Sequence, residues 1–120
     1  MSTDSSVIIT ALVRPHMESR VVSALHDLPD FPGFFITRVR GQGRGRGMGG
    51  EYISNESELT YHEFIKLEIV CISASVDMIC SKIVDAAWTG RKGDGVVFTS
   101  PAHSFGRIRE LGAFKREASA

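Results

Sequence analysis

The segment from Thr89 to Gly95 has the residue types of an anion-binding loop. It reads Thr-Gly-Arg-Lys-Gly-Asp-Gly, so three glycines fall within six residues, beside two adjacent cations, Arg91 and Lys92. Glycines let backbone N–H groups approach a ligand closely and adopt positive φ, and the cations supply charge for a phosphate or a carboxylate. The simpler interpretation is a plain turn that joins a helix to a strand. Features elsewhere in the chain must decide between these two interpretations.

Composition restricts the chain to one small globular domain. It has 120 residues and 42% hydrophobic content, enough for one modest core. Its 14 basic and 14 acidic residues cancel, so no bulk field would recruit nucleic acid or an anionic membrane. The N-terminus has neither a basic start nor a long apolar segment, which favours a cytoplasmic location without membrane insertion. Cys71 and Cys80 lie in apolar patterns and are interpreted as core residues rather than reactive or metal-binding thiols.

Hydrophobic spacing predicts four strands and two helices. Residues 7–13 are apolar at almost every position, as in a strand buried on both faces, and residues 65–71 alternate at period two. Further strands are predicted at 34–40 and 96–99, and helices at 17–28 and 76–88, where apolar residues recur every three or four positions. Residues 105–111 could form a further strand or hook, and residues 113–120 are expected to be a tail that frays at its end.

The order of these elements predicts an α+β fold. They occur as βαβ, a long insertion, and βαβ again, which packs most simply as a four-stranded antiparallel sheet with both helices on one face. We therefore expect residues 1–120 to form a single ferredoxin-like domain. A sheet face open to water should alternate with polar residues, but the first strand does not. Self-association that buries roughly 800 Å² per partner would cover this face.

The insertion, residues 41–63, differs sharply in composition from the rest. Its first half is rich in glycine and arginine, and its second half is acidic. A loop of this length in a compact domain is usually functional or disordered, and its glycines make it costly to order without a ligand or partner. We interpret it as a mobile, partner-contacting loop; the alternative is a tolerated excursion without a function.

Taken together, these features resemble the PII signal-transduction family. The resemblance covers roughly residues 7–112, and the following motifs carry it: Val13-Arg14-Pro15, residues 39–44 (Val-Arg-Gly-Gln-Gly-Arg), residues 66–70 (Lys-Leu-Glu-Ile-Val), residues 89–95, and Arg107-Ile108-Arg109. It implies a homotrimer that binds an adenine nucleotide (ATP, ADP or AMP) in clefts between subunits. It also implies that the long loop contacts a regulated enzyme, transporter or transcription factor. The trimer would cover the open sheet face.

Carried onto this sequence, the resemblance implies a nucleotide site and a partner-contacting loop. The nucleotide site would contain Gly41, Gly43, Val70, Gly93, Asp94, Gly95, Arg107 and Arg109, and the loop contacts would include Arg44, Arg46 and Tyr52. In an extended segment, residues two apart point to the same side, so Arg107 and Arg109 would present two guanidinium groups to one polyanion. Without the glycine loop, the simpler interpretation of these two arginines is a solvated face.

Departures from the family pattern argue against joint sensing of Mg-ATP and 2-oxoglutarate. Gly45 stands where the family has a glutamine that binds the magnesium ion, and Phe64 stands where a lysine pairs with 2-oxoglutarate. Val96 replaces a lysine that reaches the nucleotide phosphates. Each lost charge-assisted contact commonly costs about 1.5–3 kcal/mol. Ser57 occupies the place of the tyrosine that some members have uridylylated, so we do not expect that modification either.

Other functional classes explain fewer features of the chain. The Arg-Gly stretch at 40–47 resembles RNA-binding segments, but it is brief and lies in a neutral domain. No nucleophile, base and acid occur at a recognisable spacing, so no enzymatic activity is predicted. His62 and nearby carboxylates do not form a convergent ligand set, so no metal site is predicted. The sequence predicts a PII-like regulator, and a trimeric regulator of heavy-metal homeostasis that does not depend on nucleotide is the alternative.

Overall fold

A computed structural model of the chain describes residues 5–42 and 61–119. Residues Gly43, Arg44, Gly45, Arg46, Tyr52 and Ser57, which the sequence singles out, lie outside the described residues. The elements are β1 (Ser6–Val13), a 3-10 turn (Pro15–Met17), α1 (Glu18–His26), β2 (Phe35–Gly41), β3 (His62–Ile72), a second 3-10 turn (Ser73–Ser75), α2 (Val76–Ala87), β4 (Gly95–Ala102) and α3 (Ile108–Ser119).

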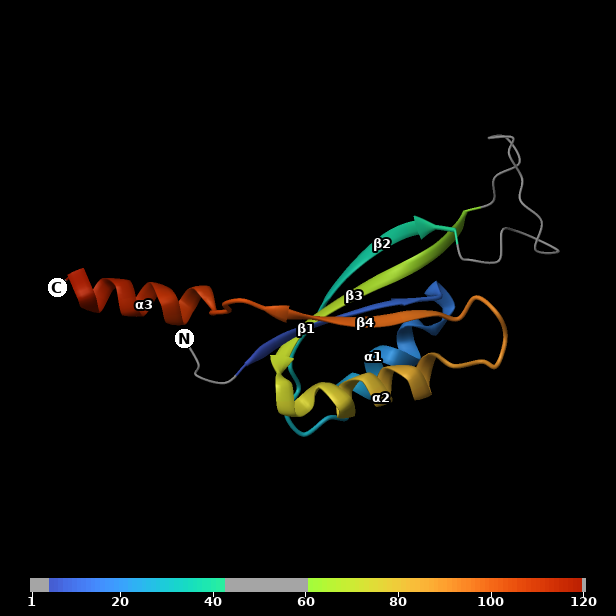
Figure 1. The fold of residues 1–120 in the computed structure, drawn as a ribbon, viewed down its shortest axis with the longest axis horizontal. Helices are drawn as coiled ribbons and strands as arrows, with labels where there is room; N and C mark the ends of the chain where they lie inside the picture. The colour runs from blue at the N-terminus through green and yellow to red at the C-terminus, as the bar shows by residue number, and fades with distance from the viewer. Residues whose placement is uncertain (1–4, 43–60, 120) are drawn as a thin grey trace.

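The four strands form one antiparallel sheet in the order β2-β3-β1-β4. The helices α1 and α2 lie together on one face of this sheet (Figure 1). This is the ferredoxin-like arrangement that the order of elements predicts, and the prediction is confirmed. β2 ends and β3 begins at the same end of the sheet, where Gly41 lies opposite His62.

The core lies between the sheet and the two helices. Ile9, Ala11 and Val13 alternate on β1 and are buried, and each points toward the helices. The other fully buried large side chains are Val21, Leu25, Ile65, Leu67, Ile69, Ile79 and Ile83. Cys71 and Cys80 pack against this core, and burial raises the pKa of both thiols, which favours their protonated form at neutral pH.

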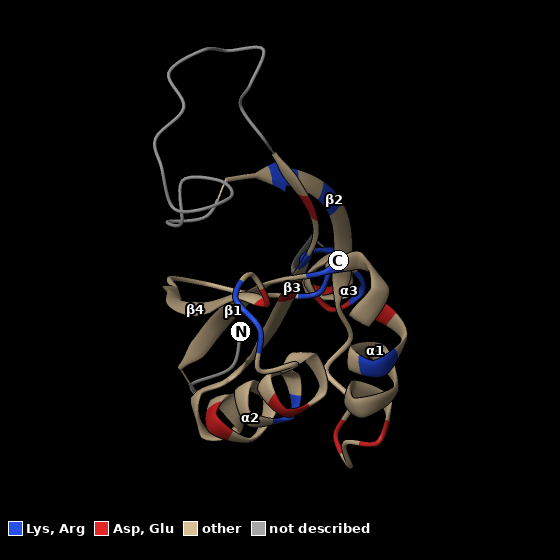
Figure 2. Cartoon of the chain, turned by 90° about the vertical axis from the view of Figure 1, so that its right-hand side faces the viewer, with Lys and Arg blue, Asp and Glu red and all other residues tan. Residues whose placement is uncertain are grey.

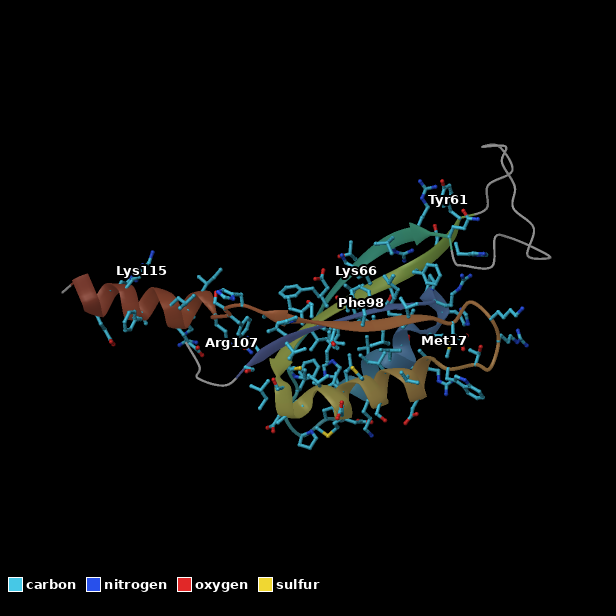
Figure 3. The ribbon with its side chains drawn as sticks, in the orientation of Figure 1. Met17, Tyr61, Lys66, Phe98, Arg107 and Lys115 are labelled. Carbon is cyan, nitrogen blue, oxygen red and sulfur yellow. The ribbon has the colours of Figure 1, made fainter. Side chains whose placement is uncertain are left out.

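The opposite face of the sheet has no described element packed on it and carries apolar side chains at both edges. One row across the sheet runs Phe35, Glu68, Thr10, Phe98, because each residue pairs with the next in register. At its ends, Phe35 is 78% exposed and Phe98 is 53% exposed. Figure 3 labels Phe98 on β4 and Lys66 on β3, the strands on either side of β1. An isolated chain therefore exposes large apolar side chains to water on this face, which is typical of a protein–protein interface.

The C-terminal segment differs from the sequence-based prediction. The sequence predicts a strand or hook at 105–111 and a tail over residues 113–120, but residues Ile108–Ser119 form α3. Glu, Leu, Lys, Arg and Ala dominate this stretch and all favour helix, and Ile108, Leu111 and Phe114 recur at helical spacing. The helix projects away from the body and makes no extensive contact with another described element (Figure 1).

Candidate functional site

The loop between α2 and β4 is closed by a clamp of two side chains. The Thr89 N–H donates to Asp94 Oδ2 at 2.7 Å, and the Thr89 hydroxyl donates to Asp94 Oδ1 at 2.5 Å. The Arg91 N–H donates to Thr89 Oγ1 at 3.2 Å. The hydrogen bonds from the Thr89 side chain and backbone, with smaller effects from Gly90 and His16, lower the pKa of Asp94 below its usual range. Asp94 is thus ionised at neutral pH, and it fixes the shape of the loop.

Two of the loop glycines have φ values that other residues rarely adopt. Gly93 has φ +88° and Gly95 has φ +122°. A Cβ on Gly95 would collide with the carbonyl oxygen of Leu12, whereas a Cβ on Gly93 would meet no atom within 4 Å. Gly95 therefore allows β4 to pass close to β1, and Gly93 leaves the outer side of the loop open. Arg91 and Lys92 are exposed beside it, which gives an anion both backbone N–H groups and charge.

Aromatic side chains hold arginines at the base of the β2–β3 pair, at the same end of the sheet. The Arg14 guanidinium lies 5.2 Å from the centroid of the Phe64 ring, and the Arg40 guanidinium lies 5.7 Å from that of Tyr61. A hollow of about 160 Å³ is lined by Pro15, Arg38, Val39, Arg40, Glu63 and Phe64. The basic positions of β2 lie in the half of the strand that leads to its end, where the chain leaves the sheet (Figure 2). Arg14 and Arg40 were not predicted as site residues from the sequence. Arg38 and Arg40, two positions apart beside a long loop, were nevertheless a usable signal.

The predicted nucleotide site is divided between opposite ends of the sheet. Gly41, Gly93, Asp94 and Gly95 lie at the end where β1 finishes, since Gly95 pairs with Val13. Val70 pairs with Ile8 on β1, five positions away from Val13, which corresponds to roughly 17 Å along a strand. Arg107 and Arg109 follow β4 still further in that direction (Figures 1 and 3). One chain does not bring these two groups of residues together.

The geometry predicted for Arg107 and Arg109 is wrong. They are not in an extended segment: the Arg107 carbonyl accepts the first helical hydrogen bond from the Leu111 N–H at 2.9 Å, and Arg109 lies in the first turn of α3. In a helix, positions two apart diverge by about 200°, so the two side chains do not share a side by periodicity. The Arg107 guanidinium lies 5.8 Å from the Phe105 ring centroid. Both arginines instead flank the positive N-terminal end of α3.

Metal ligands do not converge in the part of the chain that the structure describes. Residues 5–42 and 61–119 contain no group of three or more His, Cys, Asp or Glu side chains that could hold an ion. These residues therefore offer no observation that favours the metal-linked alternative. None of the described helices is long and apolar enough to cross a membrane.

Comparison with known proteins agrees with this architecture. The family model described as nitrogen regulatory protein P-II matches residues 7–111. The nitrogen regulatory protein P-II of Synechocystis sp. is 38% identical over 101 residues, which cover 84% of this chain and 89% of that protein. The protein of the same name from Microchaete diplosiphon is 37% identical over the same shares of each chain. The crystal structure of Arabidopsis thaliana PII bound to citrate has a TM-score of 0.70 and 26% identity, and the match covers 88% of this chain and 85% of that one. The expected resemblance is confirmed: this chain belongs to the P-II family of nitrogen regulatory, signal-transducing proteins.

Proposed function

We propose that this chain is a signal-transduction regulator that binds an adenine nucleotide at a site built from two copies of the chain. The division of the predicted site carries this proposal. The Gly93–Gly95 loop and the Arg107–Arg109 pair lie at opposite ends of one sheet, so neither can complete the other within a chain. If one end of each copy meets the opposite end of the next, every contact contains both halves. Head-to-tail contacts of this kind close into a ring.

A homotrimeric ring also explains the open sheet face. Phe35 and Phe98 stand at the two edges of one row, with the polar pair of Glu68 and Thr10 between them. Lys66 donates a salt bridge to Glu68 at 3.4 Å on the same face, so the charges there are already paired. Packing the sheets of several copies against one another would bury the edge phenylalanines without stranding a charge. Roughly 800 Å² per partner is the ordinary area for a stable contact.

The chemistry of the two halves suits a polyphosphate. One half supplies backbone N–H groups of a glycine loop with Arg91 and Lys92 beside it, and the other supplies two guanidinium groups at the positive end of a helix. The relative from Arabidopsis thaliana binds citrate, which is also a polyanion. We propose that Val70, on the open face, contacts the adenine base, and that nucleotide binding biases residues 41–63 by its differential affinity for two loop states. Arg44 and Arg46 would then distinguish nucleotides by one phosphate, and Tyr52 would contact the regulated protein.

The test is calorimetric titration of the purified protein with ATP, ADP, AMP and cyclic AMP, each with and without magnesium and 2-oxoglutarate. Micromolar binding of a nucleotide supports the proposal. Synergy with 2-oxoglutarate would contradict the inference from Phe64, whose ring is covered by the Arg14 guanidinium and offers no ammonium group to a carboxylate. An absence of binding to every nucleotide, in protein shown by light scattering to be a trimer, would refute the proposed ligand.

A further inference from the structure

The helix α3 extends beyond the part of the chain that matches its family. The match to the family model ends at residue 111, so residues 112–119 of α3 lie outside it. Ile108 is 88% exposed and Phe114 is 70% exposed, and both lie with Leu111 along one side of the helix. A 12-residue helix is marginal alone in water, and its stability in proteins comes from packing its apolar side. The helix therefore requires an apolar counterpart, and residues 5–42 and 61–107 do not supply one.

The direction of α3 is fixed by its first turn. Leu111 packs directly over the backbone of Gly106, because a Cβ there would come within 2.7 Å of the Leu111 side chain. The Leu111 N–H also bonds to the Arg107 carbonyl at 2.9 Å. These contacts hold the first turn of α3, which includes Arg109, close to Gly106 and Arg107. Wherever Arg107 binds, the first turn of α3 is held nearby, with Arg109 on the side of the helix away from Leu111.

An exposed tryptophan stands beside the loop to which we assign the phosphates. Trp88 is the only tryptophan of the chain, directly precedes the loop, and is 68% exposed. Its ring lies over Gly90, 3.2 Å from where a Cβ would stand, so one side of the ring rests on the loop. A large exposed aromatic side chain next to a ligand loop is a strong anchor for a contact, since it can bury about 150–250 Å².

We propose that α3 docks on the Trp88 side of the phosphate loop of a neighbouring copy of the chain. This inference rests on the two-copy site, which places Arg107 and Arg109 of one copy at the loop of the next. Phe114 and Ile108 then reach Trp88 of that copy and bury its exposed side. The two aromatic side chains together would cover roughly 300–500 Å² of apolar surface.

Charge supports this choice of occupant. The exposed cations of the loop are Arg91 and Lys92. Glu110 and Glu117 lie seven positions apart on α3, hence on one side of the helix and adjacent to its apolar stripe. Lys115, seven positions after Ile108, lies at the other edge of the stripe, so the glutamate edge of α3 must face the loop for the two carboxylates to approach Arg91 and Lys92. A regulated protein or a membrane surface as the occupant would leave this complementarity between two parts of the same chain unexplained.

The first experiment uses the emission of the single tryptophan. Phe114→Asp removes the apolar anchor, and Ala113→Asp is the matched control, because it adds the same charge outside the apolar stripe, about 100° around the helix from Phe114 and about 160° from Leu111. We expect the emission maximum of Trp88 to shift to the red and its quenching by acrylamide to increase in Phe114→Asp, and neither to change in Ala113→Asp. Equal shifts in both variants, or no shift in Phe114→Asp, would overturn the proposal.

A cross-linking experiment decides whether the contact joins two copies, even if Phe114→Asp dissociates the assembly. The variant with Trp88→Cys and Phe114→Cys should form linked dimers and trimers under mild oxidation, since a disulfide needs Cα atoms within about 7 Å. The variant with Trp88→Cys and Ala113→Cys should not. Absence of linked chains in the first variant, or a link within one chain, would refute the docking. Nucleotide binding with no cross-link refutes only the docking, and a cross-link with no nucleotide binding refutes only the proposed ligand.

Discussion

Two variants that each destroy one half of the proposed site should restore binding when they are mixed. Gly93→Glu places a carboxylate in the phosphate loop, where a Cβ meets no atom within 4 Å, although the φ of +88° makes the residue strained by about 1–2 kcal/mol. Replacing both Arg107 and Arg109 with alanine removes the other half. The two halves lie at opposite ends of the sheet, so each variant chain keeps one half intact.

The magnitude follows from the contacts removed. A hydrogen bond to a charged group contributes about 1.5–3 kcal/mol, so each lost arginine should weaken nucleotide binding roughly 10- to 150-fold. Either variant alone should then bind no nucleotide in a micromolar titration. If the variants are unfolded together in equal amounts and refolded, about a quarter of the contacts in a closed ring combine an intact loop with an intact arginine pair. Calorimetry should recover that fraction of the binding sites at close to the original affinity.

Failure of this complementation would refute the two-copy site. A mixture that binds no nucleotide, although native mass spectrometry shows mixed trimers, would mean that both halves must belong to one chain. Simple co-incubation without refolding is the matched control, because intact trimers that do not exchange subunits should remain inactive. Binding by the Arg107 and Arg109 variant alone would remove these residues from the site without affecting the fold.

Three further substitutions test the parts of the structure that position the site. Gly95→Ala should destabilise the protein by more than about 1–3 kcal/mol, measured by urea unfolding, because the new Cβ collides with the Leu12 carbonyl oxygen at an unfavourable φ. Asp94→Asn should lower the free energy of unfolding at neutral pH by loosening the Thr89 clamp. Because the pKa of Asp94 is depressed in the folded state, the stability that its carboxylate contributes is present above the unfolded pKa of about 3.9 and is lost as pH falls through the lower folded pKa. The urea midpoints of wild type and variant should therefore converge below about pH 4. Phe98→Arg should convert the assembly to monomers in light scattering, because it places a charge on the open sheet face.

Matched substitutions separate these effects from general damage. Gly112→Ala adds a methyl group where no atom lies within 4 Å, inside a helix, so it should stabilise slightly; a loss equal to that of Gly95→Ala would contradict the steric explanation. Val84→Arg changes a side chain on α2 that is exposed to a similar extent as Phe98, and it should leave the assembly intact. If the midpoints of Asp94→Asn and wild type, followed as pH is lowered, already converge above about pH 5, the depressed Asp94 pKa is contradicted.

Most of the fold could be predicted because its hydrophobic periods are unambiguous. The buried alternation of Ile65, Leu67 and Ile69 and the four-residue spacing of Ile79, Ile83 and Ala87 each admit one element type, and both are observed. The ends were less predictable. The last strand was expected at 96–99 but runs over Gly95–Ala102, because pairing with the whole of β1 extends it through polar and proline positions that have no strand pattern of their own.

That underestimated strand explains why the sequence did not show how far apart the two halves of the predicted site lie within one chain. Gly95 and Arg107 are 12 positions apart, so a flexible connection could bring them together, whereas a paired eight-residue strand spans about 26 Å and holds them apart. A residue-by-residue transfer from a family names the components of a site without saying which chain supplies each one. The clamp between Asp94 and Thr89 was missed for a related reason: a short-range hydrogen bond within a loop leaves no periodic signal.

The division of the site also links ligand binding to assembly. If neither half holds a nucleotide in an isolated chain, the monomer has no complete site, and a ligand that binds only the ring stabilises it by mass action. The open sheet face and the projecting α3 then serve one purpose, since each is exposed in a single chain and each would be buried in the ring. Apparent nucleotide affinity should therefore fall when the protein is diluted below the concentration at which the ring dissociates. An affinity independent of protein concentration across that dissociation would mean that a single chain contains a complete site, which the separation of Gly95 from Arg107 by the length of β4 opposes.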